Sequence, residues 1–259
     1  MNSSADFFTP SDKVVVVVGG TGKVGNAIVS SLIKSGAIVV SVSRGASTNV
    51  DDADYSKFPG ALYKILSDAT TESGIESIKE FLHKNNLTPN VLINALSYRP
   101  HDRYLSQALD KWDDVVLKNS RSTYMLCKIF GDLMQANGGG SIINISSIYG
   151  VVAPDPALYD GLDMGTEADY PFIKAGCLAL TRYFASYYGS RQVRFNSIIL
   201  GGVFNDQDPE FVRRYIAKVP LARMATKHDI CGAIHFLASD ASSYITGASI
   251  PVDGGYTSR

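Results

Sequence analysis

Short apolar runs alternate with longer amphipathic segments along the chain, and this alternation predicts parallel strands joined by crossover helices. The apolar runs are Lys13–Val18, Ile38–Ser43, Ala61–Leu66, Asn90–Asn94, Gly140–Ser146, Arg194–Leu200 and Ala248–Val252. The helical segments are Lys23–Ser35, Ile75–Lys84, Lys111–Ala136, Tyr170–Gly189, Pro209–Ala217 and His228–Ser239. We therefore expect an α/β fold in which helices cover both faces of a parallel sheet.

Composition limits the classes of protein to consider. The 259 residues carry 24 basic and 25 acidic side chains, a formal charge of −1, which gives no field to attract nucleic acid or an anionic membrane. The apolar runs are far shorter than the ~20 residues of a membrane-spanning helix, and the polar first dozen residues do not resemble a signal peptide. No repeat or linker divides the chain. We expect one cytoplasmic domain, residues 1–259, with a Rossmann-type, doubly wound, seven-stranded sheet.

Neither the cysteines nor the histidines have the spacing of a metal site. The three cysteines are odd in number and widely separated, which favours buried free thiols over disulfides: Cys127, Cys177 and Cys231. The four histidines show no metal-ligand spacing: His83, His101, His228 and His235. We predict no metal ion.

A glycine-rich turn follows the first apolar run directly. Val14–Val18 leads into Gly-Gly-Thr-Gly-Lys-Val-Gly at 19–25 and then into an apolar-periodic helix. Glycines let the backbone turn tightly and approach a pyrophosphate, and the first N–H groups of the helix favour negative charge. A glycine turn alone is also a common structural turn. Its position after the first strand favours a dinucleotide site.

The end of the second strand indicates which dinucleotide binds. A carboxylate there normally accepts hydrogen bonds from the adenosine ribose of NAD. Here Ser43 and Arg44 occupy the position, and a guanidinium suits the 2′-phosphate of NADP. We therefore predict NADP(H) over NAD(H). Lys23 either adds a second positive charge or is a solvated lysine, and Asp68 either accepts from the adenine amino group or caps the following helix.

Tyr170 and Lys174 are four residues apart, which places a phenol and an ammonium on one helix face. A phenol is a poor base near neutrality, and a neighbouring cation stabilises its phenolate. Tyr124 and Lys128 have the same spacing, so the motif alone does not choose between the pairs. The strand 140–147 ends in serines ahead of Tyr170, and ligands bind at the carboxyl ends of such strands. This favours Tyr170 and Lys174.

Taken in order, these motifs resemble the short-chain dehydrogenase/reductase family over nearly the whole chain. The resemblance rests on the glycine turn, Asn94-Ala95, Asn119, Ile145-Ser146-Ser147, Tyr170 with Lys174, Arg194-Phe195-Asn196-Ser197-Ile198, Phe236-Leu237-Ala238-Ser239-Asp240 and Val252-Asp253-Gly254-Gly255. It implies a homotetramer or homodimer, and the apolar run from His228 to Arg259 is suited to an oligomer surface.

The resemblance also implies roles for single residues. Tyr170 would be the general acid/base, and Lys174 would assist its proton loss and bind the nicotinamide ribose. Ser147 would polarise the carbonyl, whereas Ser146 would be a strand-end hydroxyl bonded to backbone, and Asn119 would anchor a water relay toward Lys174. The implied cofactor-binding residues are Gly19, Thr21, Gly22, Lys23, Val24, Gly25, Ser43, Arg44, Asp68, Asn94, Ala95, Tyr170, Lys174, Gly201 and Val203.

The chain departs from the family pattern at several points. Val18 stands where threonine is common, and Gly19, Gly22 and Gly25 have a spacing more usual in the nucleotide-sugar-modifying branch. Leu96-Ser97 follows Asn94-Ala95 where the family often has Asn-Asn-Ala-Gly, and no proline precedes Gly201. The interval of 23 positions from Ser147 to Tyr170 is longer than usual, so residues 148–169 must loop out beside the catalytic cleft.

That extended active-site loop is either a solvated surface loop or a lid that bonds polar groups of the substrate. We expect Tyr149 and Tyr159 in it to contact substrate, together with residues 203–226, the second expected substrate loop. Across the cleft, the segment from Tyr98 to Arg103 is either a plain basic loop or one in which Arg99 meets a phosphate or carboxylate.

The sequence thus predicts an NADP(H)-dependent oxidoreductase that interconverts a carbonyl and a secondary alcohol on a small polar substrate, such as a sugar derivative. Family members of bacterial surface-glycan sugar pathways have a similar extended loop. One alternative is a nucleotide-sugar epimerase or dehydratase, which the glycine spacing favours but the short stretch after Gly255 does not. Another is a non-catalytic NADP-binding sensor, although all four catalytic positions are occupied.

Overall fold

A computed structural model describes residues 6–45, 55–99 and 108–258. Its strands form one parallel sheet in the order β3-β2-β1-β4-β5-β6-β7. The chain therefore winds outward from β1 to one edge, returns to β4 and winds to the other edge, which confirms the Rossmann-type fold. The strands are β1 (Val14–Val18), β2 (Ile38–Ser43), β3 (Ala61–Leu66), β4 (Val91–Asn94), β5 (Gly140–Ser147), β6 (Val193–Leu200) and β7 (Ser249–Val252).

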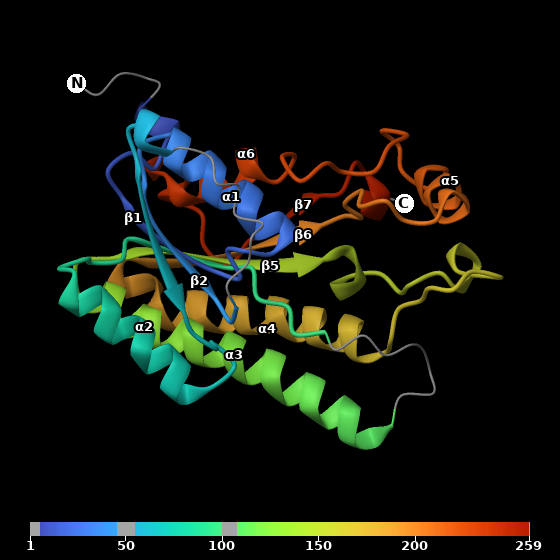
Figure 1. The fold of residues 1–259 in the computed structure, drawn as a ribbon, viewed down its shortest axis with the longest axis horizontal. Coiled ribbons are helices and arrows are strands. Elements are labelled where there is room, and N and C mark those ends of the chain that lie inside the picture. Colours follow the sequence, from blue (N-terminus) through green and yellow to red (C-terminus); the bar gives the residue numbers. More distant parts are fainter. Residues whose placement is uncertain (1–5, 46–54, 100–107, 259) are drawn as a thin grey trace.

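Helices cover both faces of the sheet (Figure 1). One face packs on α1 (Lys23–Lys34) and α6 (Cys231–Ala238), and the other on α2 (Glu72–Lys84), α3 (Leu109–Ala136) and α4 (Asp169–Tyr188). Because side chains alternate along a strand, Val15 and Val17 join the first core while Val14, Val16 and Val18 join the second. Strand β1 is therefore buried on both sides, as its continuous apolar sequence requires, whereas the edge strands β3 and β7 are partly exposed.

The starts of α3 and α4 lie within two residues of those expected, whereas two other helices begin three residues away. The predicted start of α2 at Ile75 is wrong by three residues, because the Thr71 hydroxyl caps the helix by accepting a hydrogen bond from the Gly74 N–H at 3.0 Å. The predicted start of α6 at His228 is too early, because residues 226–229 form a turn in which Asp229 accepts from the Thr226 N–H.

One short helix and one loop segment lie beyond the carboxyl ends of the strands. The short helix α5 (Pro209–Ile216) lies there, beside the segment that joins β5 to α4 (Figure 1). That segment contains single-turn helices at Ile148–Gly150 (η3) and Pro156–Leu158 (η4). The remaining 3₁₀ turns are η1 (Asp6–Phe8), η2 (Tyr55–Lys57), η5 (Gly189–Arg191), η6 (Asp240–Ser242) and η7 (Tyr256–Ser258).

The three cysteines are buried and unbridged, and burial raises the pKa of the Cys127 thiol to about 12. Within the described ranges, no group of histidine, cysteine and acidic side chains is arranged to hold a metal ion. The helices over the same residues include none with the length and apolar character needed to cross a bilayer.

Candidate active site

The glycine turn between β1 and α1 is too tight for side chains. Gly19 has a φ of +82°, and a Cβ there would lie 2.8 Å from the carbonyl oxygen of Ala95 at the end of β4. A Cβ at Gly25 would lie 2.1 Å from the carbonyl oxygen of Gly19. The turn therefore needs glycine at both positions, and it brings the start of α1 close to the ends of β1 and β4.

A cavity of about 540 Å³ opens above this turn. Gly22 is the N-cap of α1, and over the described residues no side chain caps that helix, in contrast to α2 with Thr71. The start of α1 therefore offers its N–H groups and dipole to an anion. An open cavity beside an uncapped helix start fits a dinucleotide. Its lining comprises Val18, Gly19, Thr21, Gly22, Lys23, Val24, Gly25, Val42, Ser43, Arg44, Gly45, Ser67, Ala69, Thr70, Ala95, Leu96, Ser97 and Tyr98.

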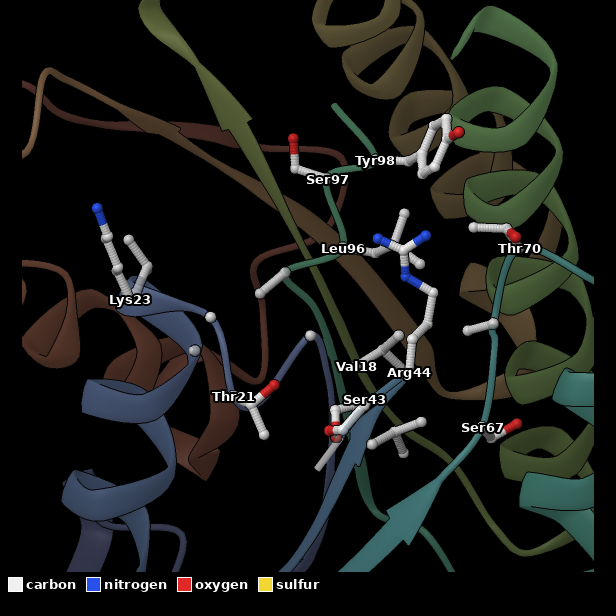
Figure 2. Close-up of a pocket in the computed structure, with 18 residues that line it drawn as sticks. Val18, Thr21, Lys23, Ser43, Arg44, Ser67, Thr70, Leu96, Ser97 and Tyr98 are labelled. Carbon is white, nitrogen blue, oxygen red and sulfur yellow. Dashed lines mark hydrogen bonds between the residues drawn. The ribbon is translucent and has the colours of Figure 1, made fainter. Parts of the chain in front are cut away.

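Arg44 extends from the end of β2 across this cavity toward the ring of Tyr98, while Lys23 stands on the other side (Figure 2). The Arg44 guanidinium carbon lies 5.1 Å from the centroid of the Tyr98 ring. The Tyr98 hydroxyl donates to the Asp114 carboxylate at 2.9 Å, and the hydrogen bond from Lys118 holds the pKa of that carboxyl below its usual range. The ring on which Arg44 rests is therefore itself held in place.

Two predicted cofactor residues lie behind the cavity wall instead of in its lining. Asp68 accepts hydrogen bonds from the backbone N–H and the hydroxyl of Thr70 at 3.0 and 2.7 Å. The Asn94 amide donates to the Asn144 side chain at 3.2 Å, and its oxygen accepts from the Leu96 N–H. Both thus shape the segments after β3 and β4.

Several lining residues were not predicted from the sequence. Ser67, Ala69 and Thr70 follow β3, and Leu96, Ser97 and Tyr98 follow β4. The rule that ligands bind at the carboxyl ends of parallel strands applies to both strands and is the signal that identifies these segments.

A second cavity, of about 310 Å³, contains Ser147, Tyr170 and Lys174 together. Lys174 is 7% exposed, and its ammonium donates to the Ile145 carbonyl oxygen at 2.9 Å. The same nitrogen lies 5.6 Å from the centroid of the Tyr170 ring. Strand β5 and the first two turns of α4 therefore bring a hydroxyl, a phenol and an ammonium into one space.

The two serines at the end of β5 both line this cavity but have different hydrogen-bond partners. The Ser146 hydroxyl donates to the carbonyl oxygen of Lys174 at 2.9 Å, which fixes α4 to the strand. The Ser147 hydroxyl accepts from the Tyr149 N–H at 3.2 Å, and its own proton remains available to a ligand. This geometry is consistent with the choice of Ser147 over Ser146, although that choice stays a prediction.

Tyr124 and Lys128, which have the same spacing as Tyr170 and Lys174, lie at the surface instead of in a cavity. Tyr124 is 46% exposed on α3, and Lys128 forms an ion pair with Asp132 at 2.9 Å. This pair lies on the helix surface, and the residues that line the two cavities do not include it.

Asn119 is buried in α3 and holds the segment after β4. Its side-chain oxygen accepts from the Tyr98 N–H at 2.9 Å, and its amide donates to the Tyr98 carbonyl oxygen at 2.9 Å. The amide also donates to the Val115 carbonyl oxygen. The side chain thus fixes the backbone beside the cavity, and the predicted water relay remains a prediction.

Residues 148–169 form a packed wall of the second cavity. Leu158 and Tyr159 are 1% and 6% exposed and pack with Phe211 and Tyr215. Arg214 on α5 donates to the carbonyl oxygens of Ala157 and Asp160 at 3.1 and 2.7 Å. This part of the loop is therefore held against α5.

Two phenols in this wall form a chain of hydroxyl groups. The Tyr149 and Tyr159 hydroxyls lie 2.8 Å apart, and Tyr159 lies 2.9 Å from the Thr166 hydroxyl. Burial raises the pKa of Tyr149, so its hydroxyl stays protonated and able to donate. All three residues line the cavity.

The segment 203–226 forms the remaining side of the cavity. Val203 pairs with Ala225 in an isolated parallel bridge, and the Gly202 N–H donates to the Tyr215 hydroxyl at 2.6 Å. Burial raises the pKa of Tyr215 to about 12. Gly201, Val203 and Met224 from this region line the cavity.

Arg99 lies over the ring of Tyr170, the predicted acid/base. Its guanidinium carbon is 4.4 Å from the centroid of the Tyr170 ring, and it forms an ion pair with Glu167 at 3.0 Å. The rest of the basic loop, including His101 and Arg103, lies outside the described residues.

Comparison with known proteins identifies the family. The profile of a family described as enoyl-(acyl carrier protein) reductase matches residues 21–257. The chain is 29% identical to the 3-oxoacyl-(acyl carrier protein) reductase of Pseudomonas aeruginosa, over 94% of this chain and 96% of that protein. It is 27% identical to a sorbose reductase of Candida albicans, over 97% of this chain and 89% of the relative.

Solved structures agree with these relatives. A short-chain dehydrogenase from Leptospira borgpetersenii with bound NAD⁺ superimposes with a TM-score of 0.87 at 30% identity, over 99% of this chain and 96% of that one. A putative NAD(P)-dependent gluconate 5-dehydrogenase from Beutenbergia cavernae with bound NADP has a TM-score of 0.85 at 27% identity, over 98% and 100% of the two chains. The expected resemblance is confirmed: the chain belongs to the short-chain dehydrogenase/reductase family and is an oxidoreductase.

Proposed function

We propose that this oxidoreductase uses NADP(H) to interconvert a carbonyl and a secondary alcohol on a small polar substrate. The observation that carries the proposal is the continuity of the two cavities, since Val24, Ala95 and Ser97 line both. A ligand that fills the glycine-turn cavity therefore reaches the space that contains Ser147, Tyr170 and Lys174. Reduction of the substrate balances as carbonyl + NADPH + H⁺ → secondary alcohol + NADP⁺.

The chain's own residues hold the cofactor and handle the proton. Gly19, Gly22 and Gly25, with the start of α1, bind the pyrophosphate, and Lys174 bonds the nicotinamide ribose. When bound, the nicotinamide supplies or accepts hydride. Tyr170 gives its proton to the substrate oxygen during reduction and takes it back during oxidation, while Lys174 stabilises the phenolate between the two states.

Ser147 positions and polarises the carbonyl from the opposite side of the substrate oxygen. Its hydroxyl hydrogen bond becomes stronger as negative charge develops on that oxygen. Asn119 fixes the backbone of Tyr98 beside the site, which helps to hold the reacting groups in position.

Arg44 is the basis for the choice of NADP(H) over NAD(H). Its guanidinium and the Ser43 hydroxyl lie at the end of β2, in the lining of the cofactor cavity. The Arg44→Asp variant is the direct test, because a carboxylate at the same place repels a 2′-phosphate and accepts from a ribose. We expect wild type to bind NADPH more tightly than NADH and the variant to reverse that order. A wild type that prefers NADH would overturn the assignment of Arg44.

The hydroxyl groups in the wall formed by residues 148–169 support a hydroxylated substrate, such as a sugar derivative. A substrate of this kind would give the enzyme a role in carbohydrate metabolism. Tyr149, Tyr159 and Thr166 offer hydroxyls to such a molecule, and the sorbose reductase and putative gluconate 5-dehydrogenase relatives are named for compounds of this kind. Holoenzyme loaded with NADPH should reduce members of a panel of ketoses, oxo acids and acyl ketones, measured as loss of absorbance. Inertness toward every carbonyl would refute the proposed reaction.

We expect the enzyme to act in the cytoplasm as a homotetramer or homodimer. The unbridged cysteines support a reducing compartment. Large apolar side chains exposed on α3 and α4 support self-association, notably Leu117, Tyr124, Tyr183 and Tyr187. Light scattering on the purified protein tests the oligomeric state, and a monomer at micromolar concentration would contradict it.

A further inference from the structure

The second cavity is cationic. Among the described residues that line it, the charged side chains are Arg99 and Lys174. Glu167, which is not part of that lining, forms an ion pair with Arg99. Lys174 is buried and bonded to the carbonyl oxygen of Ile145. The Arg99 side chain is 44% exposed, so its guanidinium is accessible to a ligand. Such a cavity favours a substrate that carries negative charge.

Arg99 has a fixed position beside the phenol. The preceding residue, Tyr98, has both its N–H and its carbonyl oxygen bonded by the buried Asn119 side chain. From this anchored backbone the guanidinium stacks over the Tyr170 ring, with its carbon 4.4 Å from the ring centroid. A group bound by Arg99 therefore lies next to the oxygen that Tyr170 protonates.

Glu167 shows which chemical group this guanidinium binds. Its carboxylate lies 3.0 Å from an Arg99 nitrogen, and it belongs to the wall formed by residues 148–169. The planar guanidinium has further N–H donors in a fork that matches a carboxylate. The Arg99 side chain is 44% exposed and its guanidinium has five N–H donors, so a second carboxylate can share the guanidinium with Glu167 or replace it.

We propose that Arg99 is a specificity-determining residue that binds a carboxylate of the substrate, and that Glu167 occupies Arg99 when substrate is absent. The substrates are then 2-oxo or 3-oxo acids and the corresponding hydroxy acids, because the carboxylate must lie close to the reacting carbonyl. The carboxylate itself is unchanged in the reaction. This inference rests on the proposed oxidoreductase function, and it narrows the substrate class of the same site.

Binding without turnover tests the subsite independently of activity. The probes are oxamate and malonamate, unreactive acids with a carbonyl next to or one carbon from the carboxylate, and the neutral oxamide and malonamide. We expect calorimetry on the NADPH-loaded protein to detect an acid but neither amide. Arg99→Gln should weaken acid binding by roughly 30-fold. Arg99→Lys, which keeps the charge, should retain part of it.

The matched control is Arg121→Gln, which removes one positive charge from the surface of α3, outside the cavity. It should bind the acids as wild type does. Glu167→Gln should bind them several-fold more tightly, because the internal competitor is gone. Equal acid binding by wild type and Arg99→Gln, or amides that bind as tightly as acids, would overturn the subsite. Unchanged binding in Glu167→Gln would overturn the role of Glu167.

Kinetics separate a failure of this inference from a failure of the proposed function. If Arg99→Gln lowers kcat/KM for an oxo acid but not for its neutral amide, both the proposed reaction and the carboxylate subsite are supported. If neutral ketones are reduced and Arg99→Gln changes nothing, the oxidoreductase stands and the subsite falls. If no carbonyl is reduced and the acids still bind through Arg99, the subsite stands and the proposed reaction falls.

Discussion

The two cavities of the cleft are constructed in different ways. The cofactor cavity lies at the carboxyl ends of β1, β2, β3 and β4, and its turn has glycines where backbone segments approach most closely. The substrate cavity consists of side chains, many of them aromatic, from residues 148–169, α5 and the segment after β6. Backbone tolerates little change, whereas side chains can be substituted one at a time. We therefore expect substitution of the turn glycines to weaken binding more than single substitutions in the wall of the second cavity do.

The Tyr170→Phe variant should have the largest effect, because it removes the acid/base where the two cavities meet. General acid/base catalysis contributes up to about 10,000-fold, and we expect kcat to fall by roughly 1,000-fold while the affinity for NADPH is unchanged. Steady-state absorbance and fluorescence titration measure the two quantities. Tyr124→Phe is the matched control, with full activity expected. Substantial activity in Tyr170→Phe would remove the proposed mechanism.

Gly25→Ala tests the backbone cavity. The new Cβ would lie 2.1 Å from the Gly19 carbonyl oxygen, so the turn must open. We expect NADPH affinity to fall roughly 100-fold, about 2.7 kcal/mol of binding free energy. Overpacking should lower the free energy of unfolding by about 2 kcal/mol. In contrast, Gly232→Ala in α6 meets open space and should leave NADPH binding intact. An unaffected Gly25→Ala would show that the turn is not rigid.

Tyr159→Phe tests the side-chain cavity, where we expect a smaller change. Loss of the hydroxyl leaves Tyr149 and Thr166 without their shared partner. We expect KM for the substrate to rise roughly fivefold, as for the loss of about 1 kcal/mol of hydrogen bonding, with KM for NADPH unchanged. Tyr244→Phe, which alters an exposed hydroxyl, serves as the control. A parallel rise in KM for NADPH would mean that the two cavities are not independent.

Acidic pH should have the smallest effect, and we consider it at the wall of the substrate cavity. The hydrogen bond from Lys218, at 2.6 Å, lowers the pKa of Asp155. The contact therefore contributes stability above the ordinary aspartate pKa of about 4 and is lost as pH falls through the lower value of the folded protein. Hydrogen exchange near η4 should increase over that range in wild type. In Asp155→Asn it should be high at every pH, and equal protection in both proteins would contradict the prediction.

The difference between the two cavities also explains how much of the site could be predicted from the sequence. Val14–Val18 with the glycine turn, and Arg44 at the end of β2, are recognisable because local spacing determines their place in this fold. The stacking of Arg99 on Tyr170 and the bonds from Arg214 to the 148–169 segment join residues that are far apart in the chain. No periodicity relates such residues, so their contacts become visible only in the structure.

Strand β5 is bonded to α4 through both the backbone and the side chain of Lys174. The Ser146 hydroxyl donates to the Lys174 carbonyl oxygen, and the Lys174 ammonium donates to the Ile145 carbonyl oxygen. Lys174 is thus attached to β5, next to the centre of the sheet, by bonds that do not involve residues 148–169. We therefore expect the wall beyond Tyr149 to accept changes of length and composition without loss of this attachment. New substrate preferences are therefore accessible by exchange of a single chain segment.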